Sequence, residues 1–347
     1  MADKEIHRRA FRRTDDYTPG SPKVKLVHEP LPLPLNPTAV LIKVHAISLN
    51  YRDANIANGG NPWPVIPNGI PGNDAAGEVA AVGDKVTSFR VGDRVAPITD
   101  TKYLTARSVG RSWLAADEDG VLADYIVFDE MTVCKLPSYL PWAAAATIPC
   151  AGVTAWAALK GMIIGQTVLI QGTGGVSVFA LKLARTAGLR VILSSSSDKK
   201  LRQMQKGYPD LLTVNYATNR DWHEEVLQHT DSVGVDIVIE NGGSSSLIQS
   251  LRCTRRGGIV SQVGYLGGKG KGDELAELVP LLIDRRILLR GINCGSKVDM
   301  EDLCNALSAN RTPLDDIIDR VQPFEEAEAA IQYIWEGKQI GKIVLDV

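Results

Sequence analysis

A cluster of glycines between two apolar stretches could bind the phosphates of a cofactor. Glycines let the backbone turn sharply and approach a pyrophosphate without a Cβ in the way. The N–H groups and the dipole at the start of a following helix then attract the phosphates. The chain offers this arrangement after the apolar run 168–170, and we expect the binding turn to comprise Gly172, Thr173, Gly174, Gly175 and Val176.

A helical pattern and a second apolar run follow the glycines. Apolar residues recur at a spacing that places them on one face of a helix, at Val176, Phe179, Ala180, Leu183 and Ala184. Gly188 ends this helix, and the run 191–193 closes the unit. Strand, glycine turn, helix and strand within about 30 residues predict a βαβ dinucleotide-binding unit. The third glycine of the usual pattern is replaced by Ser177, so an ordinary glycine-rich turn is the alternative.

The residues after the second apolar run indicate which dinucleotide is bound. An NAD site usually places Asp or Glu here, to accept hydrogen bonds from the ribose hydroxyls. This chain has serines at 194–197, followed by Asp198 and two lysines. Hydroxyl and ammonium groups suit a 2′-phosphate, which a carboxylate would repel. We therefore predict NADP(H), bound by Ser195, Ser196 and Lys199. The alternatives are Asp198 as the ribose acceptor, or a solvated polar loop.

Length and composition limit the class of protein. A chain of 347 residues is long enough for two domains. Its 38 Lys and Arg against 40 Asp and Glu give a net charge of -2, which does not favour nucleic acid as a partner. The apolar stretch 143–164 is interrupted by Pro149, Gly152 and Lys160, so we expect no membrane span. We therefore expect a small molecule as the partner.

The cysteines and the N-terminus indicate the compartment. The five cysteines include no C-x-x-C pair, and an odd number does not suggest a disulfide framework, which favours reducing conditions. Residues 1–13 contain no apolar core of a secretory signal. We therefore predict a cytoplasmic protein.

The elements that must position these residues fall into two kinds. Residues 1–140 contain a strand pattern at 39–46 and further short strands separated by Gly-Asp turns, which predict a barrel-like β domain. From about residue 143 the chain becomes helical. From residue 167 strands and helices alternate, which predicts a parallel, doubly wound sheet. The expected later strands are 212–216, 235–240, 258–264 and 287–292. We expect helices at 221–229, 300–309 and 324–337, and a last strand, 342–347, that returns to the first domain.

The order of the motifs resembles a known family. They run PGNDAAGEV, RVGDRV, ATIPCAGVTAWAAL, GTGGVS, VDIVIENGG, GGIVSQVGY, PFEEAEAAI and GKIVLDV. This order is similar to that of the medium-chain dehydrogenase/reductase superfamily, especially its zinc-independent, quinone-oxidoreductase-like branch. The resemblance implies a chaperonin-10-like catalytic domain, a β-barrel formed by 1–150 and 296–347. It implies a Rossmann domain at 151–295, an active site between the two, and a homodimer.

The resemblance also implies further cofactor contacts. Thr154 matches a residue beside the nicotinamide in relatives, and Tyr216 matches a contact on the adenosine side. For Tyr216 and Tyr265, simple packing at a strand end is the alternative. The remaining cofactor contacts expected by position are Asn241, Gly264, Tyr265, Asn293, Cys294, Ser296 and Lys342.

The resemblance bears on metal as well. Zinc-containing members carry a cysteine where this chain has Asn50 and a His–Glu pair near Asn73 and Asp74, and only Cys150 matches a zinc ligand. Catalytic zinc needs three protein ligands. The four clustered cysteines of a structural zinc lobe are also absent from 100–124, and the five histidines show no ligand spacing. We predict no metal, and a Cys150 that is a buried thiol rather than a nucleophile.

Without zinc, another group must stabilise the charge that develops on the substrate oxygen. The candidate donors are Asn50, Tyr51 and Arg52, and Asp53 could fix Arg52 or a ribose hydroxyl. Each could instead be an ordinary loop residue. The leading hypothesis is a zinc-independent, NADPH-dependent oxidoreductase that transfers a hydride to an activated alkene, a quinone or a carbonyl. The alternatives are a trans-acting enoyl reductase of a polyketide pathway, an alcohol dehydrogenase, and a non-catalytic NADPH-binding protein.

Overall fold

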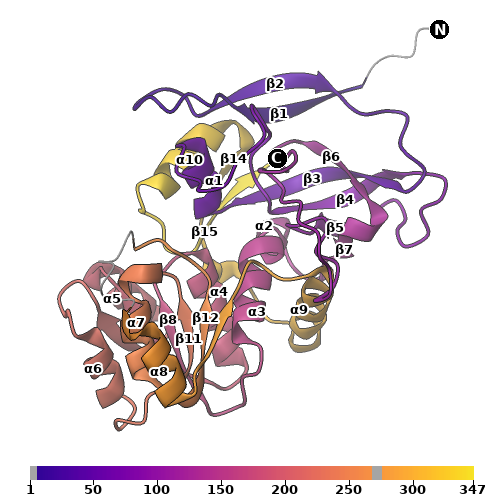
Figure 1. Ribbon diagram of the computed structural model, residues 1–347. Coiled ribbons are helices and arrows are strands. Elements are labelled where there is room, and N and C mark those ends of the chain that lie inside the picture. Colours follow the sequence, from indigo (N-terminus) through magenta and orange to yellow (C-terminus); the bar gives the residue numbers. More distant parts are fainter. Residues whose placement is uncertain (1–5, 268–275) are drawn as a thin grey trace, which may run out of the picture. The chain divides into compact units, whose positions relative to one another are not determined.

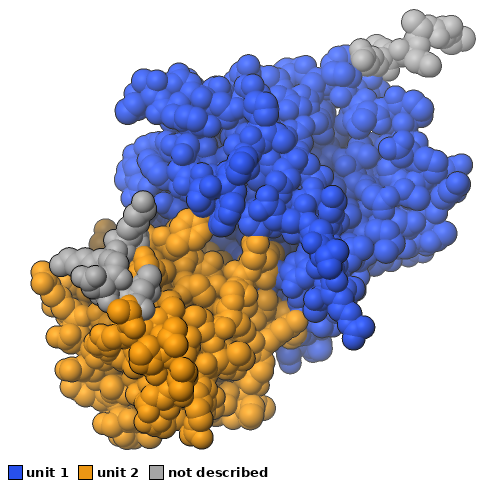
Figure 2. Space-filling view, in the orientation of Figure 1, with its two compact units in different colours: residues 1–153, 295–347 blue, residues 154–294 orange. Residues whose placement is uncertain are grey.

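The computed structural model describes residues 6–267 and 276–347. The chain divides into two compact units, coloured separately in Figure 2. Unit 1 comprises residues 1–153 and 295–347, and unit 2 comprises residues 154–294. The boundaries expected from the sequence, 150/151 and 295/296, lie a few residues away.

Unit 2 is built on a parallel sheet with helices on both sides (Figure 1). Its six described strands are β8 (Thr167–Gln171), β9 (Arg190–Ser195), β10 (Leu212–Asn215), β11 (Val235–Glu240), β12 (Thr254–Gln262) and β13 (Leu288–Gly291). They follow the order β10-β9-β8-β11-β12-β13, and all neighbours pair in parallel. This is the doubly wound order in which the first strand lies at the centre. The sheet predicted from the alternating pattern is confirmed.

Helices cover this sheet because its strands are apolar on both faces. All five residues of β8 are buried, as expected for a central parallel strand. The helices of the unit are α4 (Gly175–Thr186), α5 (Asp198–Gly207), α6 (Trp222–Gln228), α7 (Leu247–Cys253) and α8 (Leu278–Arg285), and α3 (Val153–Leu159) begins at the unit boundary. Their core includes Leu169, Ile192 and Val238.

One strand of unit 2 differs from the prediction. β12 begins at Thr254, four residues before the expected start at residue 258. Thr254 pairs with Val235, and the register shifts before Ile237. The residues between, Arg255–Gly258, are charged or small, so no apolar run marks them as a strand. The pairing partner, rather than local sequence, decides this boundary.

Unit 1 contains a seven-stranded sheet and a separate two-stranded sheet in its described part. The large sheet has the order β14-β15-β3-β4-β5-β7, and β6 pairs with β3. Its strands are β3 (Ala39–Leu49), β4 (Ala75–Val82), β5 (Arg94–Pro97), β6 (Tyr125–Asp129), β7 (Val133–Lys135), β14 (Ile318–Pro323) and β15 (Lys342–Asp346). The last strand, β15, pairs with β3, which confirms the predicted return of the chain to the first domain.

Few helices accompany this sheet. They are α1 (Tyr51–Ala57), α2 (Trp142–Ala145), a π-helical turn at Ile148–Gly152, α9 (Lys297–Asn310) and α10 (Ala327–Trp335). α1 packs against α10, and apolar residues of both join the core of the sheet, among them Ala54 and Ile331. The combined helical stretch 142–159 is long and apolar enough to cross a membrane by length and composition alone. It is 78% buried, as expected of a core helix.

The segment 51–53, interpreted as a possible loop, is the first turn of α1. Asn50 is the residue before the helix, and Asp53 is its third residue. Asp53 Oδ2 accepts from the Asn50 N–H at 2.8 Å, and the Asp53 N–H donates to the Asn50 backbone oxygen at 3.0 Å, so this carboxylate caps the start of the helix. Candidate catalytic residues therefore lie at a helix N-terminus.

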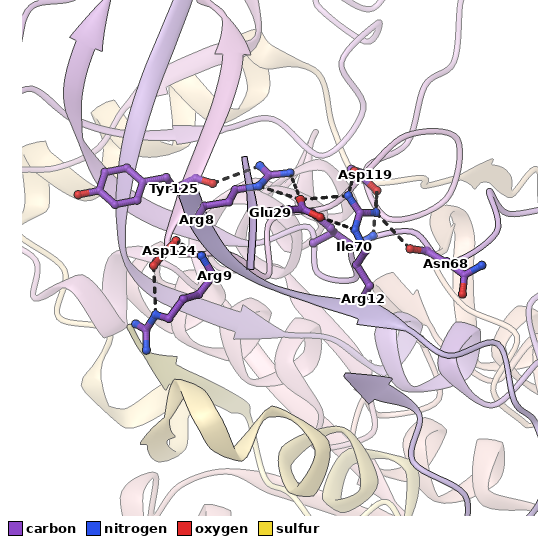
Figure 3. Close-up of polar contacts among 9 residues, drawn as sticks. All are labelled: Arg8, Arg9, Arg12, Glu29, Asn68, Ile70, Asp119, Asp124 and Tyr125. Carbon is purple, nitrogen blue, oxygen red and sulfur yellow. Dashed lines mark hydrogen bonds and ion pairs between the residues drawn. The ribbon is translucent and has the colours of Figure 1, made fainter. Parts of the chain in front are cut away.

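A charged network attaches the two-stranded sheet, β1 (His7–Arg13) and β2 (Val24–Pro30), to the rest of unit 1 (Figure 3). Arg8 and Arg12 of β1 both donate to Glu29 of β2, at distances of 2.6–3.0 Å. Arg12 also binds Asp119 at 3.0 Å, and Arg9 binds Asp124 at 3.1 Å. We call Arg8, Arg12, Glu29 and Asp119 the arginine network.

Candidate cofactor and active site

The glycine turn after β8 leaves space at the start of α4. Gly172 has φ +83°, a conformation that favours glycine, and its N–H donates to Ser194 O at 2.7 Å. Gly174 precedes α4, and no side chain caps the helix there. A Cβ on Gly174 would meet no atom within 4 Å. The helix therefore offers uncapped N–H groups beside open space, which suits a pyrophosphate.

Ser177 explains the departure from the usual glycine pattern. Its hydroxyl is buried and donates to Gln171 O at 2.7 Å, and it accepts from Asn241 Nδ2 at 3.3 Å. The serine thus ties the first turn of α4 to the end of β8, where the usual glycine only permits close packing. Val176, expected on the buried face of the helix, is only half-buried, because it lies in the turn that faces the open space.

The carboxyl end of β9 carries the residues expected to select the cofactor. Ser195 is buried, whereas Ser196 and Lys199 are exposed. Asp198 begins α5, and its Oδ1 accepts from Asn215 Nδ2 at 2.5 Å. One oxygen of this exposed carboxylate is thus engaged, and the choice between Asp198 and the serines stays a prediction.

Tyr216 lies beside these serines. Its backbone N–H donates to Ser195 O at 3.2 Å, and its side chain is exposed. Because Gly172 N–H binds Ser194 O, the glycine turn, the serines and Tyr216 form one continuous edge at the carboxyl ends of β8, β9 and β10. Three of the predicted cofactor segments thus come together.

A buried carboxylate organises the neighbouring strand end, and sequence reasoning did not single it out. Glu240 closes β11 and is fully buried. It accepts hydrogen bonds from Gly242 N at 2.8 Å and Gly243 N at 3.0 Å. Three side chains also donate to it: Gln171 at 2.7 Å, Ser246 at 2.6 Å, and Ser250. The signal available in the sequence was a lone carboxylate at the end of an otherwise apolar strand.

Asn241 and Gly264 were predicted to contact the cofactor, and both serve this strand end. Asn241 Nδ2 donates to Gln171 O at 2.7 Å, and its backbone N–H donates to Gln171 Oε1 at 3.0 Å. A Cβ on Gly264 would lie 2.7 Å from Asn241 O, so the two backbones approach too closely for a larger residue. Their place beside the glycine turn is established, and their contact with a cofactor stays a prediction.

The other predicted cofactor residues lie in varied surroundings. Thr154 is buried in α3, Tyr265 and Asn293 are exposed, and Cys294 is half-buried with φ +58°. Ser296 belongs to unit 1, where it is buried and caps α9: both its N–H and its hydroxyl bind Asp299 Oδ2 at 2.8 Å. The Ser296 hydroxyl is therefore engaged in a capping box, and contact of this residue with a cofactor stays a prediction.

Unit 1 contains a second buried set of polar residues. Lys342, expected as a cofactor contact, is 1% exposed, and Asp74 is 0% exposed. Lys342 Nζ donates to Asp74 Oδ2 at 3.1 Å and to Asn50 Oδ1 at 2.5 Å. Asn50 Nδ2 donates to Asn73 Oδ1 and to Asp74 Oδ2, both at 2.9 Å. Asp74 Oδ1 accepts from Cys150 N–H at 2.5 Å. We call Asn50, Asn73, Asp74 and Lys342 the lysine cluster.

Burial dominates the electrostatics of the lysine cluster. Removal from water raises the pKa of Asp74, while the charge of Lys342 and the hydrogen bonds from Asn50, Lys342 and Cys150 act against that rise. Burial likewise raises the pKa of Asp53, against the hydrogen bond from Asn50 N–H. Asp53 also accepts from Gly72 N–H at 3.2 Å. Its two oxygens thus accept from backbone N–H groups, and the charge of Arg52 also acts on the carboxylate.

The side chains of the three predicted donors lie in different surroundings. Asn50 uses both hydrogens of its Nδ2 within the lysine cluster. Arg52 Nη1 donates to Leu114 O at 2.8 Å, and its guanidinium lies 5.6 Å from the Trp113 ring centroid. Tyr51 is 37% exposed with its ring stacked on Trp335 at 6.2 Å, and its hydroxyl bonds to no residue that the structure describes. Tyr51 therefore presents an exposed hydroxyl, and its contact with a ligand stays a prediction.

Three of the five cysteines offer little reactive thiolate. All five belong to the described residues and form no disulfide. Burial raises the pKa of Cys134 and Cys253 and raises that of Cys304 to about 12. Cys150 is half-buried. Within 6–267 and 276–347, no group of three or more His, Cys, Asp or Glu side chains is placed to hold a metal ion.

Comparison with known proteins places this architecture in a family. Residues 36–138 match the family model of the alcohol dehydrogenase GroES-like domain, and residues 175–309 match that of zinc-binding dehydrogenases. A zinc-type alcohol dehydrogenase-like protein of Schizosaccharomyces pombe is 35% identical over 96% of this chain and 97% of its own length. A quinone oxidoreductase of Pseudomonas aeruginosa is 29% identical, over 75% of each chain.

A solved structure supports the same assignment. The crystal structure of an alcohol dehydrogenase-type protein from Sinorhizobium meliloti is 31% identical, with a TM-score of 0.86 over 99% of this chain and 100% of that one. The match of unit 1 to a GroES-like domain and the parallel sheet of unit 2 confirm the predicted fold class. The chain therefore belongs to the medium-chain dehydrogenase/reductase superfamily, a family of oxidoreductases that bind nicotinamide cofactors.

Proposed function

We propose that this protein is an NADPH-dependent reductase that transfers a hydride to an activated alkene, a quinone or a carbonyl without a metal. The observation that carries the proposal is the carboxyl end of β9, where serines and the exposed Lys199 lie and the one carboxylate, Asp198, is bound by Asn215. Hydroxyl and ammonium groups favour a 2′-phosphate. The similarity to a quinone oxidoreductase supports the substrate class.

The chain's own residues would bind and orient the cofactor and would protonate the substrate. NADPH, when bound, supplies the hydride. The N–H groups at Gly174 and Gly175 would hold its pyrophosphate, and Ser196 and Lys199 its 2′-phosphate. Reduction of an alkene or carbonyl also requires a proton at the atom that gains negative charge. Tyr51 is our candidate for this proton donor, because its exposed hydroxyl is not engaged by any described residue.

Zinc, which one family model implies, does not fit the residues of the lysine cluster. Catalytic zinc is held by three ligands drawn from Cys, His and carboxylates. At the positions that match zinc ligands, Asn50 and Asn73 offer carboxamides, and only Asp74 and Cys150 are common zinc ligands. The Lys342 ammonium already lies 3.1 Å from Asp74 Oδ2 and would repel a divalent cation there. The proposed reaction therefore uses no metal.

Cofactor binding tests the first half of the proposal. NADPH should raise the melting temperature more than NADH at equal concentration, since a ligand stabilises the native state in proportion to its affinity. Lys199→Glu should reverse that order. The control is Lys206→Glu, the same charge change in the last turn of α5, which should leave the order unchanged. Equal stabilisation by NADH and NADPH would contradict the choice of cofactor.

A substrate panel tests the second half, with NADPH consumption as the readout. Reduction of free quinones or enones supports the proposal. Reduction of coenzyme A or carrier-bound thioesters alone would identify a trans-acting enoyl reductase. The name of the S. pombe relative favours alcohol dehydrogenase as the second candidate, and turnover that requires added zinc would establish it. NADPH binding without any turnover would indicate a non-catalytic cofactor-binding protein.

We also propose that the protein forms a homodimer through the edge of the unit 2 sheet. β13 ends the strand order among the described strands, and its Leu288 is 55% exposed. The preceding helix, α8, has no buried residue, and its Ile283 is 73% exposed. An edge strand can pair antiparallel with its own copy about a twofold axis. Leu288→Lys together with Ile283→Lys should give a monomer by light scattering. A wild-type monomer would contradict the proposal.

A further inference from the structure

The lysine cluster holds a cation in a place closed to water. Lys342 and Asp74 are 1% and 0% exposed, so neither charge is solvated. An ammonium ion in such surroundings needs acceptors, and a carboxylate needs donors, or burial is very costly. Each finds them: Nζ donates to Asp74 Oδ2 and Asn50 Oδ1, and Asp74 accepts from Lys342, Asn50 and Cys150 N–H.

The cluster joins four separate segments of unit 1. Lys342 is the first residue of β15, and Asn50 is the cap of α1. Asp74 directly precedes β4, and Cys150 lies in the π-helical turn. The ammonium binds Asn50 and Asp74 directly, and Asp74 in turn binds Cys150 N–H. Joining separate segments through one charged group is the structural task that a metal ion performs in closed metal sites.

The orientation of the Asn50 carboxamide follows from the cation. Its oxygen faces the ammonium, and both hydrogens of its nitrogen are directed at Asn73 Oδ1 and Asp74 Oδ2. Without a positive charge at Nζ, the oxygen of Asn50 would lose its donor, and the Asp74 carboxylate would lose its counter-ion. Since Asn50 directly precedes α1, the same cation holds the side chain at the start of this helix.

We propose that the Lys342 ammonium is the built-in cation of this site: it holds Asp74 and Asn50 where a metal ion would otherwise be required, and so positions the start of α1. Lys342 is thereby a positioning residue and not a ligand of the cofactor. The inference rests on the metal-free function proposed above. Two separate measurements distinguish failure of the metal-free function from failure of the role proposed for Lys342.

Zinc titration of the full-length protein tests the metal-free premise. Wild type should bind no stoichiometric zinc by elemental analysis after gel filtration, and added Zn²⁺ should leave its melting temperature unchanged. Stoichiometric zinc in wild type that is lost in Cys150→Ser would overturn both the metal-free function and the role of Lys342.

A double-mutant cycle tests Lys342 itself. Lys342→Met should lower the melting temperature by roughly 10 °C, because it leaves Asp74 buried without a counter-ion. Asp74→Asn in the Lys342→Met background should recover part of that loss, and Lys342→Arg should recover part of it in the otherwise native chain. Lys85→Met, at an exposed lysine, is the matched control and should leave the melting temperature unchanged. If the losses in melting temperature of Lys342→Met and Asp74→Asn simply added in the double variant, the role proposed for Lys342 would be overturned, and the proposed function would remain intact.

Cofactor affinity distinguishes the two possible roles of Lys342. If Lys342 contacts the cofactor, its substitution should weaken NADPH binding; if Lys342 only holds Asp74 and Asn50, a variant that keeps the charge should bind NADPH as wild type does. The Kd for NADPH should stay within about twofold of wild type in Lys342→Arg, measured by fluorescence titration at a temperature where the variant is folded. A tenfold weaker NADPH affinity with an unchanged melting temperature would make Lys342 a cofactor contact and overturn the proposal.

Discussion

The arginine network and the lysine cluster are two ways of holding a carboxylate within the same unit. Glu29 in the arginine network is 19% exposed, and two guanidinium groups donate to it (Figure 3). Asp74 in the lysine cluster is 0% exposed and has a single ammonium group. Burial pushes the pKa of Glu29 upward, but the hydrogen bonds from Arg12 and Arg8 outweigh it, so the pKa of Glu29 is lowered. For Asp74 burial prevails, and its pKa is raised.

The difference shows that contact with an opposite charge does not by itself determine whether a carboxylate favours its ionised form. The number of donors and the remaining contact with water decide which effect prevails. A carboxylate that keeps some water and gains two guanidinium groups contributes stability at neutral pH. Burying a carboxylate away from water costs free energy, which its hydrogen-bond partners offset. Removing any one of these partners should therefore destabilise the protein. We therefore expect the loss in the free energy of unfolding to be largest for the most buried ion pair and smallest for the most exposed one.

The largest effect is expected in the lysine cluster. Asp74→Ala leaves the Lys342 ammonium buried with a carboxamide as its remaining acceptor, and we expect the free energy of unfolding of unit 1 to fall by about 3–5 kcal/mol. Urea unfolding followed by far-UV circular dichroism would measure it. Asp84→Ala removes an exposed carboxylate just after β4 and is the matched control, with an expected change near zero. A loss for Asp74→Ala as small as that of its control would mean that water reaches the cluster.

A smaller effect is expected in the arginine network. Glu29→Gln keeps the shape of the side chain but removes the charge shared by Arg8 and Arg12, and should cost about 1–2 kcal/mol at neutral pH. Because the pKa of Glu29 is lowered on folding, its charge stabilises the protein above the unfolded-state pKa of about 4.3.

The pH dependence of that loss checks its cause. The stabilisation from the Glu29 charge is lost as pH falls through the folded-state value, so the difference between wild type and Glu29→Gln should shrink at acidic pH below about 4. Unfolding curves of both proteins across pH 3–7 would show it. A difference independent of pH would mean that Glu29 acts through packing alone.

Much of the fold could be predicted because its signals are local. The glycine turn and the alternation of apolar strands and helices follow from periodicity and turn residues. The start of β12 could not, since Thr254 is placed by pairing with Val235 and not by any apolar run. The helix at Tyr51 was signalled by Asn50 and Asp53, a capping pattern that a search for donors passed over.

The site was harder to predict because its key contacts join distant residues. Lys342 and Asn50 are 292 positions apart, and Gln171 and Glu240 are 69 apart. A lone charge at either end of an apolar strand is the only local sign of such contacts, and it does not name the partner. The serines that we propose to select the cofactor could be found, because they lie at the end of β9 and directly after it in the sequence.

The smallest effect is expected at the most exposed ion pair, between Arg9 and Glu325, whose side chains are 37% and 58% exposed and lie 2.8 Å apart. Water solvates both groups, so ordering two long side chains cancels most of the attraction, and Glu325→Gln should change the free energy of unfolding by at most about 0.5 kcal/mol. Raising the salt concentration from 0.05 to about 1 M should abolish even this difference, because the screening length falls to roughly 3 Å. Arg9 retains Asp124 as a partner, which further limits the loss. A loss for Glu325→Gln comparable to that for Glu29→Gln would break the ranking by exposure, and would mean that the geometry of the guanidinium contact outweighs solvation in this unit.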